Sequence, residues 1–180
     1  MKILCLDVSS VSTGYCIMRD SKLLKNLYGK IEINKDKKFG ERVFEFESRL
    51  KKIISKTKPD LIIIEDVYCK NVLTFKVLCM FHGIVFKLSW DLLKKDPFYM
   101  KTSVARKILE VKGKDGVFNL VVDQYKLKDF TFDCDNDITD SIAIGMAYFK
   151  KVELDGEDKK RIGYNKSSRK RARKYNKGSV

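Results

Sequence analysis

The chain has 180 residues, 44% of them hydrophobic, and a net charge of +14 at pH 7. This length suits one domain with a core of its own, and so positive a balance favours a polyanion as partner. The chain has one histidine, His82, which argues against any mechanism that needs two histidines. Its five cysteines include no CxxC pair, which, with the single histidine, argues against a Cys/His zinc finger. Most cysteines stand in apolar runs, which is typical of buried thiols in a reducing compartment.

The positive charge is concentrated near the C-terminal end. Ten Lys or Arg and no acid fall within residues 159–180, which leaves only +4 for residues 1–158. We therefore expect a folded domain over residues 1–153 and a basic, disordered tail over residues 154–180. We expect no signal peptide, because the N-terminus leads straight into a strand. Charged or polar residues interrupt the most apolar stretch, so we also expect no membrane contact and a cytoplasmic location.

Three antiparallel strands are predicted at the start of the chain. Residues 2–6 form an apolar run that ends on Asp7, small polar residues follow, and residues 15–18 and 26–33 supply the next two strands. A carboxylate at the end of a buried strand is costly to desolvate unless a cation or a donor meets it. Asp7 by itself could be a turn-capping residue or a metal ligand.

A fourth buried strand also ends in an acid. Helical spacing of apolar residues predicts an amphipathic helix over residues 39–54, and the aliphatic run 61–64 then ends on Glu65. Ligands of open α/β sheets usually bind where such strands end. With a short strand at residues 98–101, the pattern predicts a central mixed five-stranded sheet, three antiparallel strands and then parallel ones, flanked by helices.

The helix predicted over residues 71–93 is apolar nearly all round, which indicates cover on more than one side, such as the sheet and a second subunit. We expect His82 to pack or to form an interface hydrogen bond here rather than to catalyse. After a short helix at 104–111, the basic, glycine-rich residues 112–116 could be a solvated turn or a phosphate contact.

The last helix of the domain is expected to begin at Asp137, with Asp140 on the same face. Acids in a first helical turn often only favour the helix dipole. Together with Asp7 and Glu65, however, they make a candidate cluster of four carboxylates. Hard oxygen donors suit Mg²⁺ or Mn²⁺, and two such ions about 4 Å apart can hydrolyse a phosphodiester.

Three stretches in this order resemble a known family. Asp7 with Gly14 and Tyr15, then Pro-Asp-Leu-Ile-Ile-Ile-Glu-Asp-Val-Tyr, then Asp-Ile-Thr-Asp-Ser-Ile-Ala-Ile-Gly look like the RuvC-type Holliday junction resolvases of the RNase H-like superfamily. The likeness runs from about Lys2 to Phe149. Each motif alone is weak, but the ordered set is specific. The small size and Lys-rich composition look more like the phage-encoded members, whose location would be the host cytoplasm.

The resemblance implies a Mg²⁺-dependent endonuclease that nicks four-way junctions and other branched DNA. It implies that Asp7, Glu65, Asp137 and Asp140 hold two Mg²⁺ ions, for which Mn²⁺ can substitute, and that the protein is a homodimer through residues 71–93. It also implies DNA-binding roles for three residues: Tyr68 as a wedge in the junction centre, and Lys112 or Lys114 as phosphate contacts.

Two features depart from the family pattern. Asp133 and Asp135 lie just before Asp137, so the third ligand could be misplaced by two residues. The tail has no counterpart in the family's body, and its basic residues are expected to add nonspecific DNA affinity, among them Arg169, Arg171 and Arg173.

Three other interpretations stay open: a nuclease that cuts RNA–DNA hybrids, a branched-DNA-binding protein without cleavage, and a sugar-kinase-like domain. The last is suggested by the Ser, Thr and Gly residues after Asp7, although the chain is short for a two-lobed kinase.

Overall fold

The computed structural model describes the backbone of residues 1–67 and 71–175, and within these ranges the side chains up to residue 156. Strands and helices follow one another as β1 (Lys2–Asp7), β2 (Ser12–Arg19), β3 (Lys22–Glu32), α1 (Phe39–Thr57), β4 (Leu61–Glu65), α2 (Val72–Leu93), β5 (Phe98–Met100), α3 (Thr102–Leu109), α4 (Gly113–Tyr125) and α5 (Phe132–Tyr175). The sheet has the order β3-β2-β1-β4-β5. The first three strands are antiparallel, whereas β4 and β5 run parallel to β1, which confirms the predicted mixed sheet.

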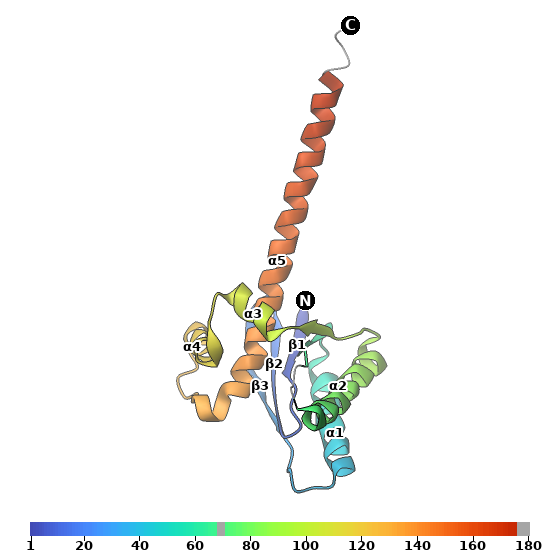
Figure 1. Ribbon diagram of the computed structural model, residues 1–180, viewed down its shortest axis with the longest axis vertical. Coiled ribbons are helices and arrows are strands. Elements are labelled where there is room, and N and C mark those ends of the chain that lie inside the picture. The colour runs from blue at the N-terminus through green and yellow to red at the C-terminus, as the bar shows by residue number, and fades with distance from the viewer. Residues whose placement is uncertain (68–70, 176–180) are drawn as a thin grey trace.

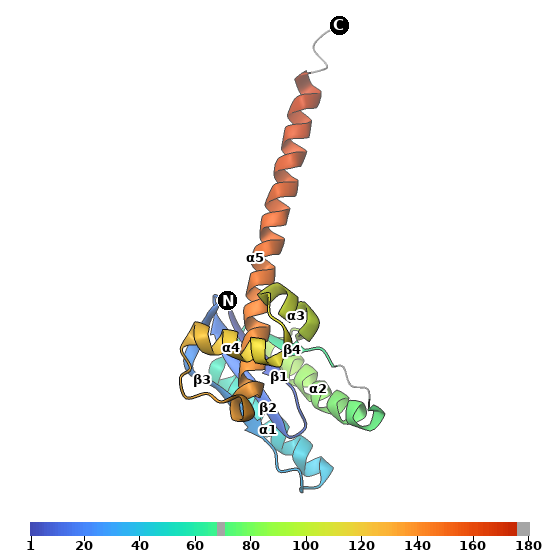
Figure 2. The same cartoon turned by 60° about the vertical axis from the view of Figure 1, so that its left-hand side comes forward.

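Helices cover both faces of this sheet (Figures 1 and 2), with α1 and α2 on one face and α3, α4 and α5 on the other. The side chains of β1 alternate between the two layers. Leu4 and Leu6 pack in the core beneath α1 and α2, while Ile3 and Cys5 pack in the core beneath α5. A strand that is apolar at every position is therefore buried on both sides, as the unbroken runs of β1 and β4 predict.

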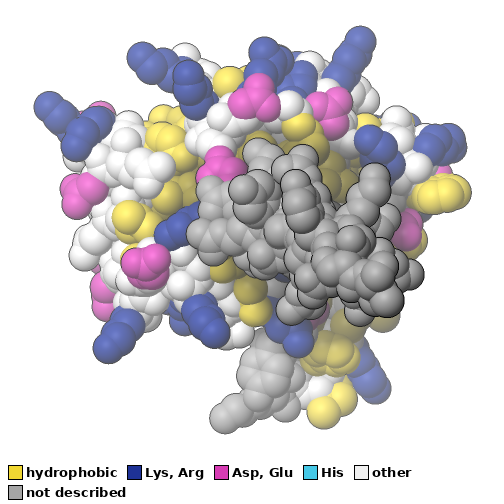
Figure 3. Space-filling model, turned by 90° about the horizontal axis from the view of Figure 1, so that it is seen from above, with side chains coloured by type: hydrophobic (Ala, Val, Ile, Leu, Met, Phe, Trp, Pro, Cys, Tyr) yellow, Lys and Arg dark blue, Asp and Glu magenta, His cyan; other side chains and the backbone are white. Residues whose placement is uncertain are grey.

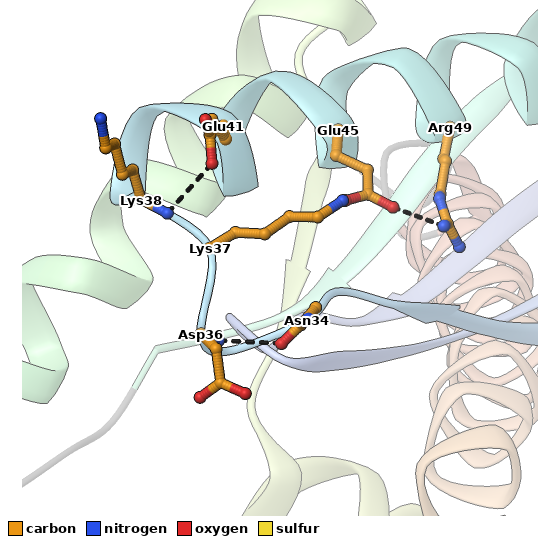
Figure 4. Close-up of polar contacts among 7 residues, drawn as sticks. All are labelled: Asn34, Asp36, Lys37, Lys38, Glu41, Glu45 and Arg49. Carbon is orange, nitrogen blue, oxygen red and sulfur yellow. Dashed lines mark hydrogen bonds and ion pairs between the residues drawn. The ribbon is translucent and has the colours of Figure 1, made fainter.

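Helix α1 begins at Phe39, the residue at which the apolar periodicity begins. The backbone N–H of Lys38 donates to Oε2 of Glu41 at 3.2 Å, which satisfies an amide that the helix itself leaves free (Figure 4). One turn on, Glu45 pairs with Lys37 at 2.8 Å and with Arg49. In the preceding loop, the N–H of Asp36 donates to Oδ1 of Asn34 at 2.9 Å. These local contacts set where the chain turns from β3 into the helix.

Helix α2 starts at the predicted place, because Oδ1 of Asn71 accepts the N–H of Thr74 at 3.0 Å. By length and composition alone it could cross a membrane, so the expectation that no such stretch exists is wrong on that criterion. Three of its side chains, Phe81, Val85 and Leu88, are buried in the core with α1 and the sheet. A helix that covers a sheet passes the same test of length and composition.

Two helix starts differ from the sequence predictions. Residues 113–116 are not a loop but the first turn of α4, which opens at Gly113 with φ of +69°. Glycine adopts this backbone conformation without strain, so α4 can begin soon after α3 ends. Helix α5 begins at Phe132 instead of Asp137, and the carboxylate of Asp135 accepts the N–H of Thr131 at 2.9 Å. This side-chain cap allows the helix to start five residues earlier than expected.

Helix α5 also continues past the predicted domain end. Its backbone remains helical to Tyr175 and projects away from the sheet (Figure 1), where the composition of residues 154–180 suggested disorder. Lys and Arg are good helix formers and no proline falls within α5, so a helix is compatible with this composition. The division into a domain of residues 1–153 and a tail stays a prediction.

Candidate functional site

Two of the four predicted acids lie side by side at the ends of β1 and β4. These strands are parallel with Leu6 opposite Ile64, so the next residue on each strand, Asp7 and Glu65, falls at the same edge of the sheet. The pKa of the Asp7 carboxyl is raised well above its usual range, first by burial and then by the neighbouring charge of Glu65. The pairing expected from the two strand ends is therefore present.

The other two acids come from α5, which crosses the same edge. Asp140 and Asp137 both raise the pKa of Asp7 through their charge, which places all four carboxylates within one electrostatic neighbourhood. The pKa of Asp140 itself is raised, mainly by burial, although Lys114 opposes this effect from 3.6 Å. The hydroxyl of Ser12 donates to Oδ2 of Asp137 at 2.5 Å.

Asp137 and the acids just before it lie in different places, and the role of Asp137 as the third ligand stays a prediction. Asp135 caps the start of α5 through the N–H of Thr131, and Asp133 is exposed. Asp137 lies one turn further on, against β2 and beside the other acids. The acids in the first turn of α5, where a carboxylate favours the helix dipole, are therefore Asp133 and Asp135 and not Asp137.

A cavity of about 370 Å³ opens at this edge of the sheet. Its lining comprises Asp7, Val8, Glu65, Asp66, Val67, Leu78, His82, Thr102, Arg106, Lys114 and Asp140. Carboxylates, cations and a hydroxyl therefore share one concave space with a short apolar wall. Such a mixture of convergent polar groups in a hollow is typical of a binding or catalytic site.

The donor set suits a hard divalent cation, since Asp7, Glu65 and Asp140 offer only oxygen. Burial is the main reason that the pKa values of Asp7 and Asp140 are raised, and the charge of Glu65 adds to the effect at both carboxyls. Within residues 1–67 and 71–156 the side chains do not yet form a group of three ready to coordinate an ion. The hydroxyl of Thr102 donates to Oε1 of Glu65.

The two candidate lysines are not equivalent. Both are exposed, but Lys114 lines the cavity and approaches Asp140, whereas Lys112 precedes α4 and is not part of the cavity lining. Arg106 lines the same cavity, and its Nε is buried without a hydrogen-bond partner among the described residues. Arg106 was not among the residues predicted from the sequence, and no local pattern distinguished it from the other basic residues.

Several predicted DNA-binding residues fall where the structure gives no side chain. Tyr68 lies outside the described residues. The backbone of Arg169, Arg171 and Arg173 belongs to α5, but their side chains lie outside the described range. On the body, Lys and Arg side chains are spread around the face seen in Figure 3 instead of gathering in one patch.

His82, for which the sequence predicts packing, also has a place at the cavity. It is 7% exposed, lines the cavity from α2, and its Nδ1 is buried without a hydrogen-bond partner among the described residues. Burial lowers the pKa of the imidazole, while Asp66 and Glu65 act in the opposite direction. No sequence signal distinguished it, because a single His in an apolar helix is usually a packing residue.

Comparison with known proteins agrees with this architecture. The sequence model of the family Crossover junction endodeoxyribonuclease RuvC matches residues 3–148. No individual curated protein matches the chain by sequence.

Similar solved structures include Thermus thermophilus RuvC in complex with a Holliday junction substrate, with a TM-score of 0.73 at 13% identity over 86% of this chain and 96% of that one. The yeast mitochondrial Holliday junction resolvase Ydc2 has a TM-score of 0.55 at 14% identity over 82% and 78% of the two chains. For the fowlpox virus resolvase with its Holliday junction the score is 0.51 at 13% identity, over 84% and 99%. At such low identity these likenesses establish the fold, while the family match covers most of the chain. The protein therefore belongs to the RuvC family of crossover junction endodeoxyribonucleases.

Proposed function

We propose that this protein is a metal-dependent, structure-selective endonuclease that resolves Holliday junctions and cuts other branched DNA. The observation that carries the proposal is the gathering of Asp7, Glu65, Asp137 and Asp140 at one edge of a RuvC-type sheet. A cluster of acids repels nucleic acid, so beside a phosphate backbone it makes sense as a cation site. The net charge of +14 supports a nucleic acid as substrate.

In this proposal the four carboxylates hold two Mg²⁺ ions, and Mn²⁺ can take their place. The ions would supply an activated water and stabilisation of the leaving oxygen. Asp7 and Glu65 bind from the sheet, and Asp137 and Asp140 bind from α5.

The cavity's other polar residues support the cluster and the substrate. Thr102 and Ser12 orient Glu65 and Asp137 through their hydroxyl hydrogen bonds. Lys114 and Arg106, on the α3 and α4 side of the cavity, would attract the phosphodiester and offset the negative charge of the acids.

A homodimer through α2 belongs to the same proposal. The side of α2 away from the sheet presents large apolar residues to solvent, with Leu73 73% and Trp90 53% exposed, and Val72, Met80 and Phe86 also exposed. Several large apolar side chains exposed on one helix suit an interaction site. In a two-fold symmetric dimer that meets through α2, the symmetry would relate the cavities of the two subunits. Two related cavities suit paired nicks in a symmetric four-way junction.

Other parts of the chain contribute to substrate binding in this view. Tyr68, which follows Glu65 by three residues, would enter the junction centre. The basic residues of 159–180 would add nonspecific affinity for DNA. The Holliday junctions bound to T. thermophilus RuvC and fowlpox virus resolvase support a four-way junction as the substrate. We place the protein in the cytoplasm, that of the host if a phage encodes it.

The decisive experiment is a cleavage assay on an end-labelled four-way junction. Linear duplex, a three-way branch and an RNA–DNA hybrid are run beside it, each with Mg²⁺ and with EDTA. We expect paired nicks near the branch point with Mg²⁺ and none with EDTA. Asp7→Asn should abolish cleavage and keep junction binding, whereas Asp123→Asn, an exposed acid on α4, should cut like the wild type.

Each other outcome selects a different function. Cutting restricted to the hybrid would make the protein a ribonuclease of the same fold. Junction binding with no cutting in Mg²⁺ or Mn²⁺ would make it a branched-DNA-binding protein. Persistent cleavage by Asp7→Asn would reject the assignment of the site.

A further inference from the structure

His82 is unusual among the inward-facing residues of α2. The buried residues of this helix are Phe81, His82, Val85, Leu88 and Ser89. Three are apolar, and the hydroxyl of Ser89 donates to the carbonyl of Lys95 at 2.6 Å. Only the imidazole leaves a buried polar atom, Nδ1, without a hydrogen-bond partner among the described residues. Buried polar groups are nearly always paired, so an unpaired one requires an explanation.

Solvent does not reach Nδ1, so a ligand can meet the imidazole only through the part of the ring that borders the cavity. The imidazole borders the cavity that holds Asp7, Glu65 and Asp140. The side chains of this cavity that can donate a hydrogen bond are Thr102, Arg106, Lys114 and His82. The first three come from α3 and α4, and His82 comes from the opposite wall, which α2 forms together with Leu78.

We propose that His82 is a further DNA-contacting residue of this cavity, whose imidazole hydrogen-bonds to a phosphodiester of the strand held there. The inference rests on the proposed function, since it assumes that DNA enters the cavity. Lys114 and Arg106 would meet the strand on one side and His82 on the other. A strand bracketed from both walls is fixed in position relative to the acids, which is a positioning effect.

A neutral imidazole suits this role. Burial lowers the pKa of His82, so that at neutral pH the ring keeps one N–H donor and one acceptor nitrogen. A neutral donor can approach a phosphate without forming an ion pair with the nearby carboxylates. Arg106 and Lys114 supply positive charge, and the imidazole of His82 supplies a directional hydrogen bond.

The single histidine of the chain allows a direct test. Wild-type protein labelled with ¹⁵N-histidine gives one pair of imidazole nitrogen resonances, which are recorded in EDTA with and without a four-way junction. We expect DNA to shift at least one of these resonances. Unchanged resonances in a DNA-saturated sample would overturn the inference. So would an equal shift with Mg²⁺ alone and no further change with DNA, because His82 would then respond to the metal and not to the strand.

Variants provide a second test, which distinguishes a contact with DNA from a role in packing alone. His82→Leu should raise the KM for the junction about tenfold with kcat less affected, as expected when one hydrogen bond to the substrate is removed. His82→Gln, which keeps an amide donor, should recover much of the affinity. Ser89→Ala, two turns along the same buried side of α2, is the matched control and should leave KM unchanged. A His82→Leu protein that folds and has the wild-type KM would overturn the inference.

The two tests keep the inference separate from the proposed function. If wild-type protein binds branched DNA but does not cut it, the proposed nuclease fails, and the imidazole resonances still decide whether His82 meets DNA. If it cuts and the resonances do not respond, the nuclease stands and His82 is a packing residue.

Discussion

Gly14 and the backbone of Asp137 are in such close contact that a Cβ on Gly14 would overlap the carbonyl oxygen of Asp137. Gly14 is also the strand partner of Asp7. The absence of a side chain at this one position therefore allows α5 to approach β2 and brings Asp137 and Asp140 to the end of β1. The distance between two pairs of carboxylates depends on a glycine that makes no chemical contribution itself.

We expect Gly14→Ala to displace α5 from the sheet. Relieving so short a contact with backbone costs about 1–3 kcal/mol of unfolding free energy. Cleavage should fall more steeply than stability, because α5 carries two of the four acids. Urea unfolding and the junction assay measure the two effects. Gly40→Ala on α1 is the control, because a Cβ there meets nothing within 4 Å, and it should retain activity and stability.

The burial of Asp7, together with the nearby charge of Glu65, predicts a pH-dependent stability in the absence of divalent metal. The pKa of Asp7 is raised in the folded chain, so the folded state holds this proton more tightly than the unfolded state does. The resulting penalty is absent below the ordinary Asp pKa, develops as pH rises toward the raised pKa, and is complete above it. In EDTA, the unfolding free energy should therefore fall across this range.

Asp7→Asn should remove most of that fall and be more stable than the wild type at neutral pH by about 1–2 kcal/mol. Mg²⁺ should raise the Tm of the wild type by binding the folded state, and should raise that of the variant less. Differential scanning fluorimetry over a series of pH values, with EDTA and with Mg²⁺, measures both effects. A wild-type stability that is independent of pH and Mg²⁺ would argue against a shared cation site.

The exposed apolar side of α2 predicts a dimer that charge would disrupt. Leu73→Glu or Trp90→Glu places a carboxylate on that surface and should give a folded monomer with weakened junction cleavage. Sedimentation velocity measures the oligomeric state, and circular dichroism verifies the fold. Phe44→Glu on α1 is the matched control, since Phe44 is 71% exposed on another helix and its substitution should leave the dimer intact. A monomeric wild type would exclude the α2 dimer.

The basic C-terminal residues predict a strong salt dependence of DNA binding. Removing residues 159–180 deletes ten Lys or Arg, and the slope of log Kd against log salt should flatten by about 0.9 for each phosphate that these residues neutralise. Fluorescence anisotropy at several salt concentrations gives the slope. Because α5 packs on the body through residues before this range, the truncated protein should keep the fold and its metal-dependent cleavage at low salt. An unchanged slope would show that these residues do not touch DNA.

The sequence alone determined the sheet and the places of the acids at its edge. Apolar runs with a two-residue period or burial on both faces indicate strands, and the acids that end β1 and β4 mark the edge where these strands stop. The start of α1 at Phe39 was equally local, because it follows from the spacing of apolar residues along the helix. Such features depend on interactions over a few residues, which a sequence displays directly.

Only the tertiary structure decided which further residues join the acids. Helix α5 starts early because Asp135 caps it, and its approach to the sheet depends on Gly14 in a strand more than a hundred residues away. The packing of α2, α3 and α4 around the sheet brings Arg106, Lys114 and His82 to one cavity and leaves Lys112 outside it. This packing involves the whole core, so no local pattern predicts it.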